Sequence, residues 1–365
     1  MTLNPTWYSN PQARTWRCPA PSSSVATFHE SLDSYTPTPL VELPDLATQL
    51  GVGRVFVKDE SARMNLGAFK ILGASWAIAQ AITGGASPQS LTDVLIHVDP
   101  DTHLVAATDG NHGRAVAHMA TILNLQSTIF VPNGVAPGAI SNIAAEGAEV
   151  ISVDGDYDAA VMQARHFTEA DAHRLLIQDM SWPGYQEIPH WIIEGYTTLC
   201  AEVDHQLSEL GLVCDVVVVP VGVGSLLESV TAHYRSANSA HPTVLSVEPL
   251  EAACVLQSLH AGKLTSVKTG TTIMAGMNCG TPSSDSWPTH HAGVDAAIAI
   301  ADEATRNAMT QMAEAGIDAG PCGAATLAAL KVLAESDDYR RDVDLGNDAV
   351  VVLLSTESTR ANPAQ

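Results

Sequence analysis

The sequence has few basic residues. Its 365 residues include 17 Lys and Arg against 40 Asp and Glu, which gives a formal net charge of −23. Such a charge repels phosphate backbones and anionic lipid headgroups, so it argues against nucleic acid or a membrane surface as a partner. The sequence also lacks any apolar run of about 18 residues, the length needed for a spanning helix. No apolar signal segment is visible near the start, so we expect a cytoplasmic protein.

Patterns that would indicate a metal site are also missing. The six cysteines are scattered without a CxxC pair, which speaks against zinc and for a reducing compartment. Among the fourteen histidines, His112, His290 and His291 come nearest to a cluster, but no HExxH spacing occurs. We therefore predict no metal site in this protein.

Apolar residues make up 46% of the sequence, enough for a large core, and the length suits two domains. After an irregular arm over residues 1 to about 35, short apolar runs alternate with segments of helical spacing. The runs "DVVVVPVG", "TVLSVEP" and "DAVVVLLST" are continuous, as in buried parallel strands. This alternation predicts an α/β fold, in which ligands bind at the carboxyl ends of strands.

One lysine lies in an unusual place. Lys70 in "NLGAFKILGA" is flanked by Ala68, Phe69 and Ile71. Desolvation disfavours an ammonium ion, so such a lysine tends to be neutral and can attack a carbonyl. The alternative is a lysine at a helix start that extends its charged end to solvent.

Two glycine-bearing loops each follow a predicted strand. "TDGNHGRA" at 108–115 would point backbone N–H groups at a small carboxylate, unless it is an ordinary strand–helix turn. "PVGVGSLLESV" at 220–230 would form an anion-binding nest at a helix start. It lacks the third glycine of a dinucleotide loop and the Gly-Lys-Ser/Thr of a nucleoside triphosphate loop, so a single phosphate monoester is the better ligand.

A third motif, "LLSTEST" at 353–359, ends the last predicted strand. The hydroxyl of Ser355 or Thr356 could meet a neutral ring nitrogen, although a plain turn would have the same sequence pattern. A reactive lysine, a phosphate loop, a carboxylate loop and a terminal hydroxyl together match one cofactor, pyridoxal phosphate.

Four segments carry a resemblance to a known family: "VKDESARMNLGAFKILGAS", "TDGNHGRAVA", "QDMSWPGYQEIPHWIIEGY" and "SVEPLEAAC" with "TIMAGMNCGTP". With them the chain resembles fold-type II pyridoxal-phosphate enzymes, which include threonine and serine dehydratases, serine racemase and cysteine synthase. Within that group it is most similar to the diaminopropionate ammonia-lyase branch. The resemblance implies a tryptophan synthase beta-like α/β fold with two parallel-sheet domains and a site in the cleft. We expect residues 1–75 with 205–365 to form a large cofactor-binding domain and 76–204 a small one.

The resemblance also assigns roles to positions. Lys70 would form the Schiff base, and Asp109 and Asp179 would transfer protons on opposite faces of the cofactor. The alternative for Asp109 is a helix N-cap and for Asp179 a loop carboxylate. Asn111 would contact the phenolic oxygen of the cofactor. The cofactor's phosphate would be held by Gly222, Val223, Gly224 and Ser225, and its ring nitrogen would face Ser355. The substrate carboxylate would be held by the backbone of Asp109, Gly110, His112 and Gly113.

The implied activity is α,β-elimination on 2,3-diaminopropionate or a close β-substituted amino acid, releasing pyruvate or another 2-oxo acid and ammonia. A dehydratase, a β-replacement synthase and an amino-acid racemase on the same scaffold are alternatives, and relatives are commonly homodimers. A sensor that binds the cofactor without turnover is a non-enzymatic alternative. Some positions depart from the branch, among them Glu228, Cys322 and Ser358. These changes leave the substrate open. Whether Cys254 and Cys279 meet cannot be read from their spacing, and buried small hydrophobes are the more common role.

Overall fold

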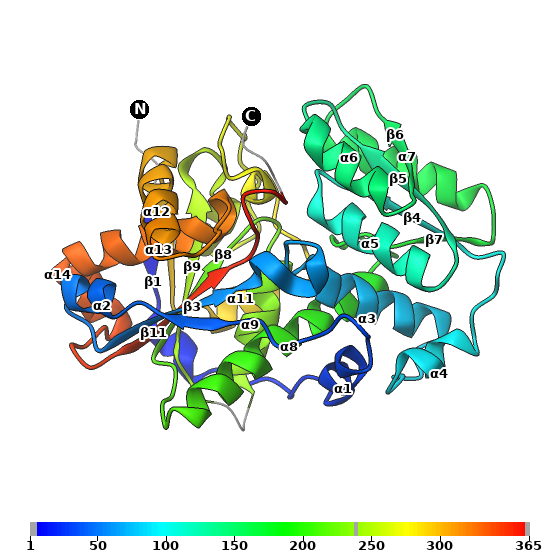
Figure 1. Ribbon diagram of the computed structural model, residues 1–365. Helices are drawn as coiled ribbons and strands as arrows, with labels where there is room; N and C mark the ends of the chain where they lie inside the picture. Colours follow the sequence, from blue (N-terminus) through cyan, green and yellow to red (C-terminus); the bar gives the residue numbers. More distant parts are fainter. Residues whose placement is uncertain (1–5, 237–239, 362–365) are drawn as a thin grey trace. The chain divides into compact units, whose positions relative to one another are not determined.

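The computed structural model describes residues 6–236 and 240–361, and the chain divides into two compact units (Figure 1). Unit 1 comprises Met1–Pro21, Pro37–Ser61 and Leu199–Ser358, and unit 2 comprises Ser22–Thr36, Ala62–Thr198 and Thr359–Gln365. The boundaries of the predicted domains, 1–75 with 205–365 and 76–204, differ from those of the two units, because residues 62–75 pack with unit 2. Those domain boundaries stay a prediction.

Unit 1 is built on a seven-stranded sheet with the order β1-β10-β9-β8-β11-β3-β2. The five central strands are parallel, and the two edge strands pair antiparallel. All residues of β8, β9 and β11 are buried, which confirms the three continuous apolar runs as buried strands. The strands are β1 (Trp7–Ser9), β2 (Leu40–Glu42), β3 (Arg54–Asp59), β8 (Val216–Pro220), β9 (Thr243–Pro249), β10 (Ala296–Ile300) and β11 (Val350–Ser355).

Helix α13 (Pro321–Glu335) is the buried helix of unit 1. It is rich in Ala and Leu, and it packs against β8 and β11 in the main hydrophobic core. An apolar surface on most sides is typical of a helix enclosed by other elements. The other helices of the unit are α2 (Pro44–Leu50), α9 (Ser225–Arg235), α10 (Cys254–Ala261), α11 (Trp287–Gly293), α12 (Asp302–Glu314) and α14 (Asp337–Val343), with short 3₁₀ turns η1 (Pro11–Thr15), η3 (Leu250–Ala252) and η4 (Ala275–Met277).

Unit 2 has a four-stranded parallel sheet with the order β6-β5-β4-β7. Its strands are β4 (His103–Ala107), β5 (Gln126–Val131), β6 (Glu149–Ser152) and β7 (Arg174–Leu176). The helices are α1 (Ser24–Glu30), α3 (Lys70–Ile82), α4 (Leu91–Leu95), α5 (Asn111–Ile122), α6 (Pro137–Ala145) and α7 (Tyr157–Glu169). Two elements contribute residues to both units: α8 (Glu187–Glu209) passes from unit 2 to unit 1 after Thr198, and the turn η2 (Glu60–Asn65) passes from unit 1 to unit 2 after Ser61. The two sheets, parallel except for the edge strands β1 and β2, confirm the predicted α/β fold. None of the helices described is both long and apolar enough to cross a membrane.

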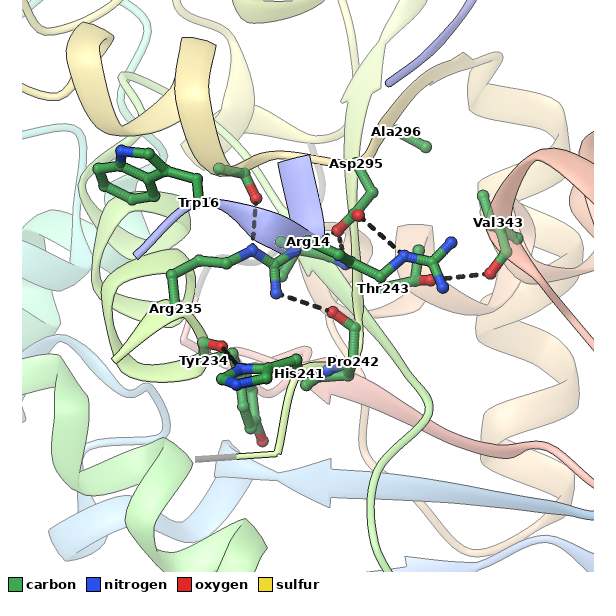
Figure 2. A network of polar contacts seen from close by, with 12 residues as sticks. Arg14, Trp16, Tyr234, Arg235, His241, Pro242, Thr243, Asp295, Ala296 and Val343 are labelled. Atoms are coloured by element: carbon green, nitrogen blue, oxygen red, sulfur yellow. Dashed lines mark hydrogen bonds and ion pairs between the residues drawn. The ribbon is translucent and has the colours of Figure 1, made fainter. Parts of the chain in front are cut away.

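The irregular arm predicted over residues 1–35 is wrong, because this segment contributes β1, η1 and α1. Figure 2 shows a contact between η1 and the rest of unit 1: Arg14 Nε donates to Asp295 Oδ1, at a distance of 3.1 Å. The other oxygen of Asp295 pairs with the fully buried Arg235 and accepts the Val244 N–H at 2.8 Å. η1 is thus tied to a buried charge pair that lies far from it in the sequence, while β1 pairs with β10.

We predict that Asp295→Ala destabilises the protein by about 3–5 kcal/mol, because it leaves the guanidinium of Arg235 buried without its counter-ion. The matched control is Asp338→Ala, which breaks an Arg–Asp pair with Arg341 in which both side chains are more than two-thirds exposed. Exposed pairs contribute only about 0–1 kcal/mol. Urea unfolding of both variants measures the difference, and equal losses would contradict the assignment.

Candidate active site

Lys70 is the first residue of α3, and the chain that leads to it is strained. Met64 and Asn65 both adopt left-handed backbone conformations, with φ of 46° and 61°. Each such residue costs on the order of 1–3 kcal/mol and persists only where its surroundings enforce it. One restraint is Arg114 of α5, whose Nη1 donates to the carbonyl of Leu66 at 2.9 Å. The approach to Lys70 is therefore held by the helix that follows the "TDGNHG" loop.

The amine of Lys70 is paired with a carboxylate. Its Nζ donates to Asp179 Oδ2 at 2.7 Å. Burial by itself would lower the pKa of Lys70, but the charge of Asp179 and this hydrogen bond outweigh burial and raise it. Burial likewise opposes the charged form of Asp179, yet the ammonium of Lys70 holds the pKa of this carboxyl well below its usual range. The prediction of a neutral Lys70 is wrong for this arrangement, because Asp179 supplies a charge that the flanking residues do not.

Aromatic rings complete the surroundings of Lys70. Its Nζ lies 5.4 Å from the centroid of the Phe69 ring and 5.9 Å from that of Tyr196. Both distances are within the range of cation–π attraction, which favours the protonated amine. Burial raises the pKa of Tyr196 to about 12, so its phenol stays protonated at neutral pH.

Asp109 and Asp179 occupy neighbouring strand ends. Asp109 follows β4 and Asp179 follows β7, and these two strands pair in parallel with Val105 opposite Leu176. Burial raises the pKa of Asp109, and the nearby charge of Asp179 raises it further, while Lys70 opposes both. Two carboxyls on one edge of the sheet thus have pKa values shifted in opposite directions, a pattern typical of acid–base pairs.

The N-cap alternative for Asp109 does not hold. Helix α5 begins at Asn111 with Gly110 at its N-cap position, and no side chain caps it. Gly113 is required by packing, because a Cβ there would lie 2.3 Å from Cγ2 of Thr108. The loop therefore approaches β4 too closely for any larger residue.

The side chain of His112 is turned away from the solvent into unit 2. Its Nε2 lies 2.7 Å from the carbonyl oxygen of Ile177 and therefore carries the proton, since a carbonyl only accepts. Its Nδ1 lies 3.9 Å from Asp179 Oδ2, and burial lowers the pKa of the ring. His112 can thus offer a ligand only its backbone, and the neutral ring lies beside Asp179.

The second glycine loop lies in unit 1, between β8 and α9. Gly224 has a φ of 107°, which favours glycine, and it precedes Ser225, the first residue of α9. A Cβ on Gly222 would lie 2.8 Å from the carbonyl oxygen of Gly276, so the backbone is closely packed on one side. A glycine-bearing turn at a helix start is a geometry that binds phosphate monoesters.

Ser355 ends β11, the strand next to β8. Its hydroxyl is fully buried and has no hydrogen-bond partner within residues 6–236 and 240–361. A Cβ on the neighbouring Gly323 would lie 2.7 Å from this oxygen, so only glycine at this position in the first turn of α13 leaves room beside the hydroxyl. Buried hydroxyls are normally paired. An unpaired one at a strand end fits a pyridine nitrogen, and unit 1 thus carries the glycine loop and the hydroxyl expected for the phosphate and the ring nitrogen of pyridoxal phosphate.

Several side chains at the site were not anticipated from the sequence. Tyr196 lies beside Lys70, and Tyr157 donates its hydroxyl hydrogen to Asp179 Oδ1 at 3.5 Å. They come from α8 and α7, far from Lys70 in the chain. Tyr196 ends one of the segments that carry the family resemblance, but the sequence assigned it no role. His290 of α11 contacts the loop at Gly224 in unit 1. Neither Cys254 nor Cys279 forms a disulfide bond within the part of the chain that the structure describes.

Comparison with known proteins gives consistent matches. The family described as Pyridoxal-phosphate dependent enzyme matches residues 32–357. Diaminopropionate ammonia-lyase of Escherichia coli K12 is 33% identical over 346 residues, which cover 90% of this chain and 86% of that protein. The enzyme of the same name from Salmonella typhimurium is 37% identical over 278 residues, covering 72% and 68%.

Solved structures agree. The crystal structure of selenomethionine-incorporated holo diaminopropionate ammonia lyase from Escherichia coli superposes with a TM-score of 0.87 at 29% identity, covering 99% of this chain and 95% of that one. Maize serine racemase superposes with a TM-score of 0.76 at 23% identity, covering 93% and 94%. The second likeness concerns the fold alone.

Asp179→Asn should lower the pKa of Lys70, because burial then acts without an opposing charge. Each unit of pKa lost raises the fraction of neutral amine about tenfold at neutral pH. In protein stripped of cofactor, mass spectrometry should show faster modification of Lys70 by an amine-directed reagent at pH 7. The exposed Lys263 is the internal control and should react at an unchanged rate. Unaltered reactivity of Lys70 would contradict the role of Asp179.

Ser355→Ala should leave the free energy of unfolding of the stripped protein unchanged or raise it by up to about 1 kcal/mol, since a buried unpaired hydroxyl is removed. Binding of pyridoxal phosphate should weaken at the same time. Ser246→Ala is the control, because the hydroxyl of Ser246 is buried within β9 and has a partner at Ala296. Urea unfolding and absorbance titration give the two quantities. A large loss of stability without loss of affinity would count against the assignment.

Proposed function

This chain belongs to the family of pyridoxal-phosphate-dependent enzymes, and we propose that it is an ammonia-lyase acting on 2,3-diaminopropionate or a close β-substituted amino acid. The observation that carries the proposal is the Lys70–Asp179 pair with Asp109 beside it, in a chain that matches diaminopropionate ammonia-lyases over most of its length. Elimination removes the α-proton and the β-amino group, and hydrolysis then releases pyruvate and the second amino group as ammonia.

The cofactor supplies one thing when bound: it withdraws electrons from Cα of an attached amino acid, so that the α-proton becomes acidic and a group on Cβ can leave. Lys70 would hold the aldehyde of the cofactor. Asp179, ionised and 2.7 Å from Nζ, would accept a proton from Lys70 and return it. Asp109, with its raised pKa, would supply or accept the other proton.

Both units carry residues expected to bind the cofactor or the substrate. In unit 1 the phosphate would be held by the backbone of Gly222, Val223, Gly224 and Ser225, and the ring nitrogen would face Ser355. In unit 2 Asn111 would contact the phenolic oxygen, and the backbone of the Asp109–Gly113 loop would hold the substrate carboxylate. The buried hydroxyl of Ser355, unlike a carboxylate, would leave the ring nitrogen largely unprotonated, which favours elimination over transamination.

Positions that depart from the ammonia-lyase branch, such as Cys322, would influence the choice of substrate. Cys322 lies at the start of α13, and its N–H donates to Oε1 of the buried Glu357 at 3.4 Å. Glu357 follows Ser355 by two residues, and Cys322 precedes Gly323, the glycine that packs against Ser355. The cytoplasmic location and homodimeric state expected from the sequence are kept as part of the proposal. Sedimentation of the purified protein tests the second of these.

Purified protein should release pyruvate from 2,3-diaminopropionate with two ammonia molecules per pyruvate and act little on serine or threonine. Lys70→Ala should abolish turnover, and Asp109→Asn and Asp179→Asn should each slow it by about 10²–10⁴-fold for at least one enantiomer, the range for a lost acid or base. Asp338→Ala serves as the surface control. Coupled assays for pyruvate and ammonia measure both products.

Other outcomes would point elsewhere. Faster pyruvate release from serine than from diaminopropionate would favour a dehydratase. Loss of optical activity without ammonia would identify a racemase, and product only with an added nucleophile would identify a β-replacement synthase. Each of these results would overturn the proposed ammonia-lyase activity.

A further inference from the structure

The carbonyl groups of the glycine loop in unit 1 are held from one side. The carbonyl of Val223 accepts the N–H of Ser283 at 2.8 Å. The carbonyl of Gly224 faces Nε2 of His290 at 3.0 Å. In a planar trans peptide the N–H of the next residue points away from the carbonyl. Holding these two carbonyls therefore turns the N–H groups of Gly224 and Ser225 to the opposite side.

His290 is placed directly behind Gly224. Its side chain is fully buried in α11, and a Cβ on Gly224 would lie 2.2 Å from its Cε1. The ring and the loop backbone are thus in direct contact, which no residue larger than glycine would allow. Gly224 is consequently needed both for its φ of 107° and for the space that the imidazole fills.

The protonation of His290 follows from its partner. Nε2 faces a carbonyl oxygen, which only accepts, so Nε2 carries the hydrogen. Nδ1 is then an acceptor, and no described residue donates to it. Burial lowers the pKa of His290 to about 4, so the ring is neutral at physiological pH. A neutral ring provides a directed donor without adding a charge behind the loop.

This hydrogen bond is not needed to satisfy the carbonyl of Gly224. That oxygen already accepts the N–H of Glu228 at 2.8 Å, the first backbone bond of α9. The second donor, from His290, fixes the direction of the peptide plane instead. It also leaves one buried ring nitrogen without a partner, an arrangement that normally costs stability.

We propose that His290 is a positioning residue for the phosphate of the cofactor: it holds the Gly224 carbonyl so that the Ser225 N–H faces a phosphate monoester. The proposal rests on pyridoxal phosphate binding at this loop and is independent of which amino acid is turned over. His290 stood out in the sequence only as a weak candidate metal ligand. The structure gives it a different use.

Two nearly isosteric variants test this role. His290→Gln keeps a side-chain N–H donor of similar reach, whereas His290→Met fills the space without a donor. Binding is compared for pyridoxal phosphate and for pyridoxal, which lacks the phosphate. The Met variant should bind pyridoxal phosphate about tenfold more weakly, as expected for one lost hydrogen bond, and should bind pyridoxal within about twofold of the parent protein. The Gln variant should recover most of the affinity.

A merely structural role would weaken binding of both compounds equally and would not separate Gln from Met. Either result, or full phosphate affinity in the Met variant, would overturn the proposal. Should the Met variant fail to fold, ¹⁵N-histidine NMR of the unsubstituted protein provides the test. An Nε2–H signal that moves on adding pyridoxal phosphate but not pyridoxal supports the role, and an unmoved signal refutes it. Binding is measured without substrate, so a failure of the lyase proposal is recognised separately.

Discussion

The ion pair between Lys70 and Asp179 is the interaction on which the electrostatics of the candidate site depend. An amine and a carboxylate that are both largely removed from water each lose hydration energy, and a contact at 2.7 Å compensates this loss. The pair keeps a transferable proton beside the reactive nitrogen. Beside the pair lies Asp109, a carboxyl whose pKa is raised. Removing any one of these three charges alters the protonation of the other two.

The geometry of this pair comes from close backbone packing. Glycines at the contact between α3 and α8 allow the two helices to approach: a Cβ on Gly195 would lie 2.4 Å from the carbonyl oxygen of Leu72, and one on Gly73 would lie 2.5 Å from Cε1 of Tyr196. Overpacking such a contact costs about 1–3 kcal/mol. The same contact places Tyr196 beside Lys70. Strain at Met64 and Asn65 in the preceding chain is thus tolerated because the helix that follows is firmly held.

In unit 1 the site keeps unfavourable features that folding alone does not explain. Ser355 has a buried hydroxyl without a protein partner among the described residues, and His290 has a buried ring nitrogen in the same condition. Parallel neighbours β8 and β11 bring the glycine loop and this hydroxyl to the same sheet edge. The buried strands that lead to them supply the rigidity that holds both in place. The buried strands therefore stabilise unit 1, whereas the carboxyl edge of its sheet carries buried polar atoms without described partners, which cost stability.

Much of this was readable in the sequence, because it depends on local pattern. Continuous apolar runs determined the buried strands, and the glycines after them predicted where an anion could approach. The motifs around Lys70, "TDGNHG" and "LLSTEST" sufficed to indicate the cofactor and the family. What the tertiary structure alone decided is the charge of Lys70, the freedom of Asp109 from capping, the inward turn of the His112 ring and the place of His290 behind Gly224. These are set by burial and by partners up to 109 residues away. Apolar neighbours in the chain predict desolvation, but only the fold can supply the counter-ion that reverses its effect.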